Sequence, residues 1–92
     1  MPTNIYRVVQ QGEAFAVQSQ KAEGGQLMKS NIILQEMGGK YENQYVGAML
    51  GDLALCKLQK GDVVAATLRF TTHQFEDKVF QDVLVTDLYK LN

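Results

Sequence analysis

The sequence predicts an all-β domain, a five-stranded Greek-key barrel with one short helix between the third and fourth strands. Three observations lead to this class. Segments rich in β-branched and aromatic residues alternate with glycine-containing or polar turns. Proline occurs only at position 2, and proline is the residue that cannot donate to a β ladder. The apolar period changes once, after residue 51, where a short helical pattern interrupts the strands.

The first strand is expected over residues 5–20, with Gly12 near its middle. A glycine inside a long strand often marks a bulge or a sharp bend. Such a bend suits a strand that must take part in two sheets of a small barrel. A polar loop at residues 21–26 ends this strand.

The second and third strands are expected over residues 27–37 and 41–51, joined by a glycine turn at residues 38–40. In the second strand, Ile32 and Leu34 should point to one face, because side chains alternate along a strand. The opposite face then carries the intervening residues.

The helical segment is expected to begin at Asp52 as N-cap and to stop at Gly61 after about two turns. Lys57 and Lys60 then fall in the last turn, where cations suit the helix dipole. Cys56 lies among leucines in this segment and is expected to be a small buried apolar residue.

The fourth and fifth strands are expected over residues 62–75 and 78–91, on either side of a turn at residues 76–78. Alternation divides their side chains into two sets. Those expected to close the barrel are Leu68, Phe70, Val83 and Val85. Those expected on the outer face of the fourth strand are Thr67, Arg69, Thr71 and His73.

This order of elements is that of the OB-fold, a small Greek-key barrel. Periodicity alone also allows a generic five-stranded α+β sandwich. With 92 residues, the chain is expected to form one domain over residues 1–92.

Composition limits the classes of function. Hydrophobic residues make up 46% of the chain, which is enough for a packed core. The formal net charge of −1 differs from the broad basic surface of a duplex-DNA binder, although a local basic stripe is compatible with it. One cysteine excludes an intrachain disulfide and fits a cytoplasmic protein. No apolar run reaches the ~18 residues of a membrane span. Because the core is small, a homo-oligomer, dimer or tetramer, is expected.

The second half of the chain resembles bacterial single-stranded-DNA-binding proteins. The resemblance rests on three short motifs, which are Gly51-Asp52-Leu53-Ala54, Lys60-Gly61-Asp62 and Leu68-Arg69. The sequence is also similar to small OB-fold proteins of Bacteroidetes bacteria, in which a Phe-x-Asp motif opens the last strand, as Phe80-Gln81-Asp82 does here. The first half of the chain matches only in strand order.

The resemblance implies an OB-fold that binds single-stranded DNA by stacking bases on aromatic residues. In the family these residues lie in the third strand and in the loop between the fourth and fifth strands. The third-strand positions here are Gln44 and Leu50, which cannot stack, so the loop with His73 and Phe75 becomes the expected stacking site.

A protein that binds single strands needs cations for phosphates and exposed rings for bases. Lys29, Lys40, Arg69 and Lys78 are the expected phosphate contacts. Phe75 is the main expected stacking residue. Tyr41, Phe80 and His73 complete the predicted nucleic-acid-binding set.

We expect no catalytic residue, metal or cofactor, because one histidine and one cysteine without clustered carboxylates make a poor ligand set or catalytic group. The alternative function is a protein–protein or assembly module that does not bind nucleic acid. Ile33, Leu50 and Leu84, if exposed together, would form the apolar patch for such a role.

Overall fold

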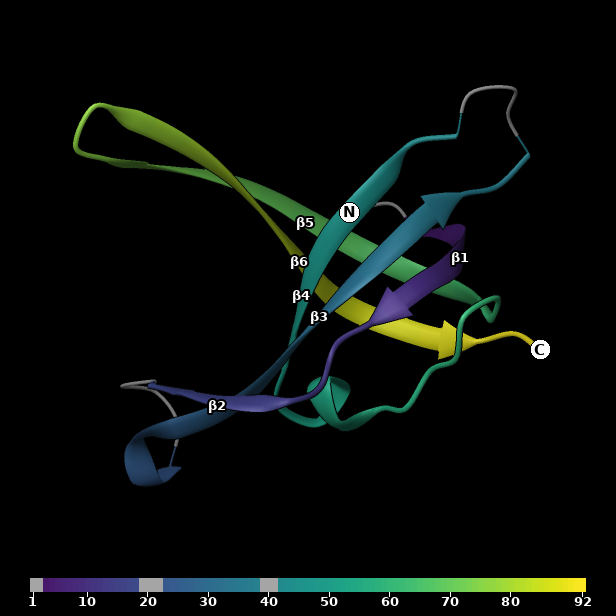
Figure 1. The fold of residues 1–92 in the computed structure, drawn as a ribbon, viewed down its shortest axis with the longest axis horizontal. Coiled ribbons are helices and arrows are strands. Elements are labelled where there is room, and N and C mark those ends of the chain that lie inside the picture. The colour runs from purple at the N-terminus through teal and green to yellow at the C-terminus, as the bar shows by residue number, and fades with distance from the viewer. Residues whose placement is uncertain (1–2, 19–22, 39–41) are drawn as a thin grey trace.

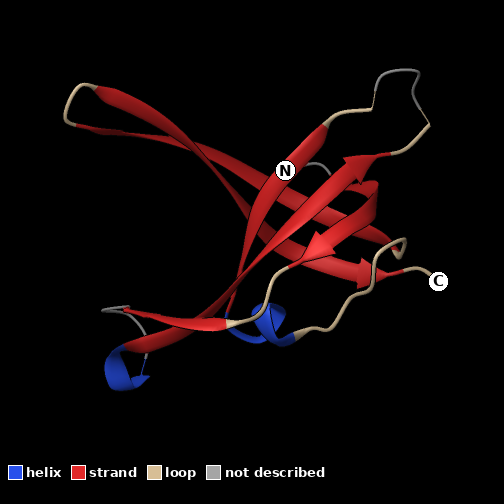
Figure 2. Ribbon diagram, viewed as in Figure 1, coloured by secondary structure: helices blue, strands red, loops and turns tan. Residues whose placement is uncertain are grey.

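The computed structural model describes residues 3–18, 23–38 and 42–92, and they form a closed six-stranded sheet of OB-fold topology (Figures 1 and 2). The described residues contain two short 3₁₀ helices and no α-helix. None of the helices in this part of the chain is long and apolar enough to cross a bilayer. The elements are β1 (Thr3–Gln11), β2 (Phe15–Gln18), η1 (Glu23–Gly25), β3 (Gln26–Glu36), β4 (Gln44–Leu50), η2 (Gly51–Leu55), β5 (Val63–Phe75) and β6 (Lys78–Lys90).

The long first strand is divided at Gly12, as its sequence predicts. β1 ends at Gln11 and β2 begins at Phe15. β1 pairs antiparallel with both β3 and β5, and its register shifts between Val8 and Gln10. This irregularity bends the strand. As a result β1 can pair with β5 and close the barrel, while β2 continues along β3.

The sheet runs in the order β1-β5-β6-β4-β3-β2, and the additional β1–β3 pairing closes it. The Greek-key barrel predicted from the sequence implies that neighbouring strands are antiparallel. That expectation is wrong for β4 and β6, which pair in parallel at Ala48 and Leu84. The other pairings around the ring require this. β4 is antiparallel to β3, β3 to β1, β1 to β5 and β5 to β6, so β4 and β6 run in the same direction.

Ten apolar side chains with little or no solvent exposure fill the barrel. Ile32 and Leu34 of β3 are completely buried, which confirms the predicted alternation of that strand. Leu68 and Val85 are buried as predicted, and Val83 packs against them from the rim. The remaining core residues are Tyr6, Val8, Met49, Ala54, Val64 and Ala66. Gly47 faces this core, where an added Cβ would lie 3.0 Å from Cγ2 of Val85.

The predicted helix is much shorter than its sequence pattern suggests. η2 is a five-residue 3₁₀ helix that ends at Leu55, so Lys57 and Lys60 lie beyond it. Asp52 lies in its first turn and is not an N-cap, because Leu50 occupies that position without a side-chain cap. Cys56 is exposed, and the prediction that it is buried is wrong. Ala54 is buried at this end of the barrel, and Leu53 and Leu58 pack against the core.

A buried hydroxyl holds η2 against the barrel. Ser30 is the one polar residue of β3 with no exposure, and its Oγ donates a hydrogen bond of 3.1 Å to the carbonyl oxygen of Ala54. Ala54 is itself 2% exposed, so water does not replace this bond easily. Ser30 therefore connects β3 to η2, the short helix that covers one end of the barrel.

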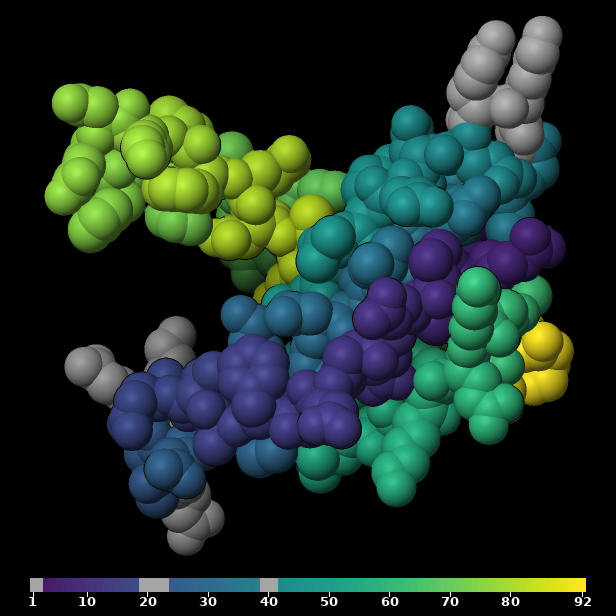
Figure 3. Space-filling model, viewed as in Figure 1, coloured from purple at the N-terminus to yellow at the C-terminus, as the bar shows by residue number. Residues whose placement is uncertain are grey.

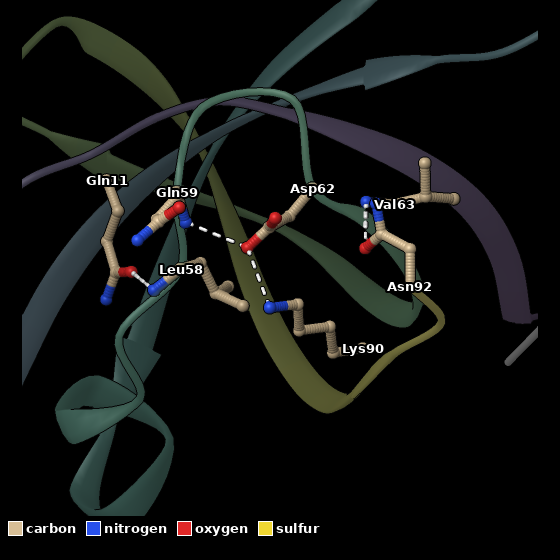
Figure 4. A network of polar contacts seen from close by, with 7 residues as sticks. All are labelled: Gln11, Leu58, Gln59, Asp62, Val63, Lys90 and Asn92. Atoms are coloured by element: carbon tan, nitrogen blue, oxygen red, sulfur yellow. Dashed lines mark hydrogen bonds and ion pairs between the residues drawn. The ribbon is translucent and has the colours of Figure 1, made fainter.

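The loop between η2 and β5 is held by side-chain hydrogen bonds instead of helical ones (Figure 4). Gln11 donates to the carbonyl oxygen of Cys56 at 2.6 Å and accepts from the backbone N–H of Leu58 at 2.8 Å. Asp62 accepts from the N–H of Gln59 at 2.9 Å and pairs with Lys90 at 3.6 Å. These contacts satisfy the backbone groups that a longer helix would have paired.

We predict that Ser30→Ala lowers the free energy of unfolding by about 1–3 kcal/mol, because it leaves a buried carbonyl without its donor. Urea denaturation at neutral pH measures this change. Thr72→Ala, on an exposed strand position, is the matched control and should change stability by no more than about 0.5 kcal/mol. Equal effects of the two substitutions would contradict the role given to Ser30.

Candidate nucleic-acid interface

The ends of β5 and β6 leave the barrel and form a projecting hairpin, visible at the upper left of Figure 1. We call residues 69–75 and 78–84 the arm. Among the described residues, β1 pairs with β5 as far as Thr67, and β4 pairs with β6 at Leu84. All arm residues from 69 to 82 are therefore exposed.

The arm ends in a two-residue turn formed by Glu76 and Asp77. Glu76 has a φ of 57°, in the left-handed region that hairpin turns of this length require. Phe75 and Lys78 are the pair beside the turn. Both the predicted turn and the predicted position of Phe75 at its start are thus found in the structure.

One face of the arm carries most of the predicted binding residues. Residues that are paired directly across two antiparallel strands point to the same side of the sheet. The register pairs Phe75 with Lys78, His73 with Phe80, and Arg69 with Leu84. Five of the eight predicted residues therefore share what we call the outer face of the arm. They are Arg69, His73, Phe75, Lys78 and Phe80.

His73 and Phe80 are held together on this face. Their rings stack at 5.2 Å between centroids, with planes 20° apart. Nδ1 of His73 lies 2.7 Å from Oδ2 of Asp82. Phe80 is 42% exposed and Phe75 is 65% exposed, so both rings remain accessible. The arm thus presents ordered aromatic surface to solvent.

Two predicted positions on the fourth strand are wrong. Thr67 is only 7% exposed, because it is paired with Thr3 of β1, and the two hydroxyl oxygens lie 2.6 Å apart. The register of β5 with β6 also shifts at this point: Thr67 is paired with Asp87 and Leu68 with Val85, so β6 has one extra residue here. Phe70 was expected in the core but is 47% exposed. It has the inward orientation, yet it lies beyond the barrel, where its ring packs edge-on against Tyr45 at 5.6 Å between ring centroids.

A groove of about 550 Å³ continues from the root of the arm onto β3 and β4. Lys29 and Asn31 line it from β3, and Thr71, Asp82 and Leu84 line it from the arm. Figure 3 shows the molecular surface hollowed between the arm and the β2–β3 hairpin. The structure therefore brings Lys29 to the same side of the molecule as the arm residues.

Phe15 is not among the site residues predicted from the sequence, yet it lies on this side of the molecule. Phe15 is paired with Lys29, which in turn is paired with Leu50, so the three side chains form a row across β2, β3 and β4. Phe15 is half exposed. Its position after the Gly12 break is the signal in the sequence that could have identified it.

Lys40 and Tyr41, the other two predicted site residues, lie outside the described residues.

The floor of the groove is apolar. Ala48 and Leu50 of β4 are half-buried in this floor, and Val46 is largely exposed there. Ile33 of β3 is paired with Val46 and extends the apolar surface beside the groove. Ala48 is paired with Leu84, which connects this floor to the outer face of the arm. Gln44 and Leu50, the family's stacking positions, offer no ring on this surface.

Tyr45 supports the root of the arm from the inner side. Its ring packs edge-on against Tyr6 and Phe70, and its hydroxyl donates to Oε1 of Glu36 at 3.2 Å. Burial raises the pKa of the Tyr45 hydroxyl above the usual value of about 10, and the hydrogen bond to the Glu36 carboxylate raises it further. The neutral phenol is thus the form that the fold favours.

The described residues contain no group of three or more histidine, cysteine, aspartate or glutamate side chains placed to hold a metal ion. Within that same part of the chain, every buried side-chain nitrogen or oxygen has a hydrogen-bond partner. The outer face of the arm presents cations, hydrogen-bonding groups and exposed aromatic rings.

No protein-family model matches the sequence, and no curated protein sequence matches it. The fold is nevertheless that of a known structure. The chain is similar to the second OB-fold domain of replication protein A from Methanococcus maripaludis, with a TM-score of 0.68 and 15% identity. The match covers 97% of this chain and 81% of that domain. At this identity, the likeness establishes the OB-fold and nothing more specific.

We predict that Tyr45 loses its proton at a higher pH than a free tyrosine. Because its pKa is raised in the folded state, Tyr45 contributes stability below the unfolded pKa of about 10. That contribution is lost as the pH rises through the folded value. Tyrosinate absorbance and urea denaturation across this alkaline range measure both effects, and Tyr45→Phe should reduce the alkaline fall in stability. An unchanged fall in the variant would contradict this assignment.

Proposed function

We propose that this protein binds single-stranded nucleic acid, DNA before RNA, without catalysing a reaction. One observation carries the proposal: five residues chosen from the sequence for phosphate and base contacts share the outer face of the arm. This face continues into a groove that Lys29 lines. In OB-folds the outer face of the second and third strands and the two adjoining hairpin loops take oligonucleotides. Those strands are β3 and β4 here.

The phosphate backbone is expected to follow the cations. Lys29 and Arg69 lie on either side of the groove floor, and Lys78 lies at the outer end of the arm. Glu76 and Asp77 occupy the tip, where their charge repels phosphate. The strand therefore enters beside Lys78 and passes along the arm toward Arg69 and Lys29. Lys40 remains a further predicted phosphate contact.

Bases are expected to stack on Phe75 and Phe80. Each stacked base contributes about 1–3 kcal/mol without strong sequence preference. The His73 ring stacks on one face of the Phe80 ring, and the contact with Asp82 fixes the orientation of the imidazole. Phe15 offers a further ring beside Lys29, and Tyr41 stays a predicted stacking residue. Cytoplasmic localisation and a homo-oligomeric state belong to the same proposal.

The groove floor favours a second candidate function. Ile33, Leu50 and Leu84 lie on one continuous outer surface with the exposed Val46. A protein–protein or assembly module without nucleic-acid binding would use this surface. The outer face of the arm favours nucleic-acid binding, because an assembly surface formed by the groove floor alone has no need for exposed rings beside cations.

We predict that labelled oligo-dT binds and that its affinity falls with salt. Three or four phosphate contacts correspond to a slope of about −2 to −3 in a plot of log affinity against log salt. Fluorescence anisotropy at several salt concentrations measures this slope. No binding at protein concentrations of about 100 µM, the weak end of non-specific affinities, would refute nucleic-acid binding.

We predict that Arg69→Ala with Phe75→Ala weakens oligo-dT binding by at least about tenfold, since one stacking contact and one phosphate contact are lost. Arg69→Ala alone should reduce the salt slope by about 0.7, and Phe75→Ala alone should leave the slope unchanged. Lys57→Ala, an exposed lysine beyond η2, is the control for net charge. If the double variant bound as tightly as the parent, the site assignment would fail while the class of function stood.

A further inference from the structure

The arm is a two-stranded ribbon with little support from the rest of the protein. Beyond Leu84 and Arg69 neither strand pairs with another element in the part of the chain that the structure describes. Apolar side chains are nevertheless exposed along it, including Val79 at 71% and Phe75 at 65%. A ribbon of two strands is marginally stable in water by itself. This arm therefore has both an unpaired edge and apolar surface to cover.

The unpaired edge of β6 has a sequence that is complementary to itself. Across residues 78–82 the order is Lys-Val-Phe-Gln-Asp, with opposite charges at equal distances from Phe80. In an antiparallel pairing of two copies centred on Phe80, each Lys78 lies opposite Asp82 of the second copy. Centring on Lys78 or on Asp82 instead would place like charges directly opposite, which is destabilising.

The alternation of backbone hydrogen bonds along the arm fits this register. The pair beside a two-residue turn, Phe75 and Lys78, exchanges both backbone hydrogen bonds, and the pattern alternates from there. The N–H and C=O groups of Val79 and Gln81 therefore point away from β5, toward the free edge. A register centred on Phe80 places Val79 of one copy opposite Gln81 of the other, so that both pairs of outward groups are satisfied.

The length of the free edge fits as well. The pairing needs residues 78–82 of each copy, and the first β6 residue that meets β4 is Leu84. The two-fold ladder therefore uses the part of β6 that precedes its contact with the barrel. Lys78 has no ion pair among the described residues, and His73 contacts only one oxygen of Asp82, Oδ2. The second oxygen of Asp82 can accept from a lysine.

We propose that two copies of this chain associate through the β6 edges of their arms, in antiparallel register about a two-fold axis at Phe80. The result is a four-stranded sheet, β5-β6-β6-β5, shared by two barrels. Such an interface is isologous, because the same residues contribute from both copies. The His73–Phe80 stacks of both copies then lie on one face of this sheet, and the partner copy extends the aromatic surface of the site.

A charge exchange tests the register. Size-exclusion chromatography with light scattering should give a mass that is twice the 10.3 kDa of one chain. Lys78→Asp and Asp82→Lys should each weaken the dimer by about tenfold, because each places like charges opposite at two symmetric positions. The double variant should restore the dimer. Lys57→Asp, which makes the same charge change as Lys78→Asp but lies away from the arm, should leave the mass unchanged.

Crosslinking tests the two-fold centre. In a Cys56→Ser background, Phe80→Cys places two thiols on the axis, where opposed Cα atoms of a non-hydrogen-bonded pair lie about 4.5 Å apart. That distance permits a disulfide. Val79→Cys should not crosslink, since its opposite residue is Gln81. A monomeric parent protein, a double variant without rescue, or equal crosslinking at both positions would each overturn the proposal. None of these readouts requires nucleic acid, so their failure is separate from failure of the proposed function.

Discussion

The pairing of β1 with both β3 and β5 is the constraint on which the rest of the structure depends. The bend after Val8 lets one strand close the barrel, and this closure buries the ten core side chains. β1 is shorter than β5, and its pairing with β5 ends at Thr67. In the part of the chain that the structure describes, the outer halves of β5 and β6 therefore have no barrel strand beside them. The projecting arm follows directly from this difference in strand length.

The arm leaves aromatic side chains accessible to solvent, at a cost in the stability of the monomer. A side chain in the barrel loses its contact with water, whereas Phe70, Phe75 and Phe80 keep much of theirs. Exposed rings are costly for a monomer, because apolar surface is more favourable when it is removed from water. The cost is offset when a ligand or a second chain covers them. The proposed nucleic-acid site and the proposed dimer therefore depend on the same feature of the fold.

Most of the candidate site was accessible from the sequence because a hairpin obeys local rules. Strand alternation and a two-residue turn place Arg69, His73, Phe75, Lys78 and Phe80 on one face without reference to the rest of the chain. Phe15 and its neighbour Lys29 are different. They become paired only through the register of β2 with β3, which the intervening loop does not specify. Their place beside the groove is a property of the folded barrel.

The sequence by itself determined the all-β class, the order of the strands, the break at Gly12 and the turn of the arm. Each of these depends on residues close together in the chain, such as glycine positions and alternating apolar side chains. Only the tertiary structure decided the length of η2, the burial of Thr67 and the exposure of Phe70 and Cys56. Burial depends on which distant strand lies alongside, and periodicity shows which way a side chain points but not whether another strand covers it.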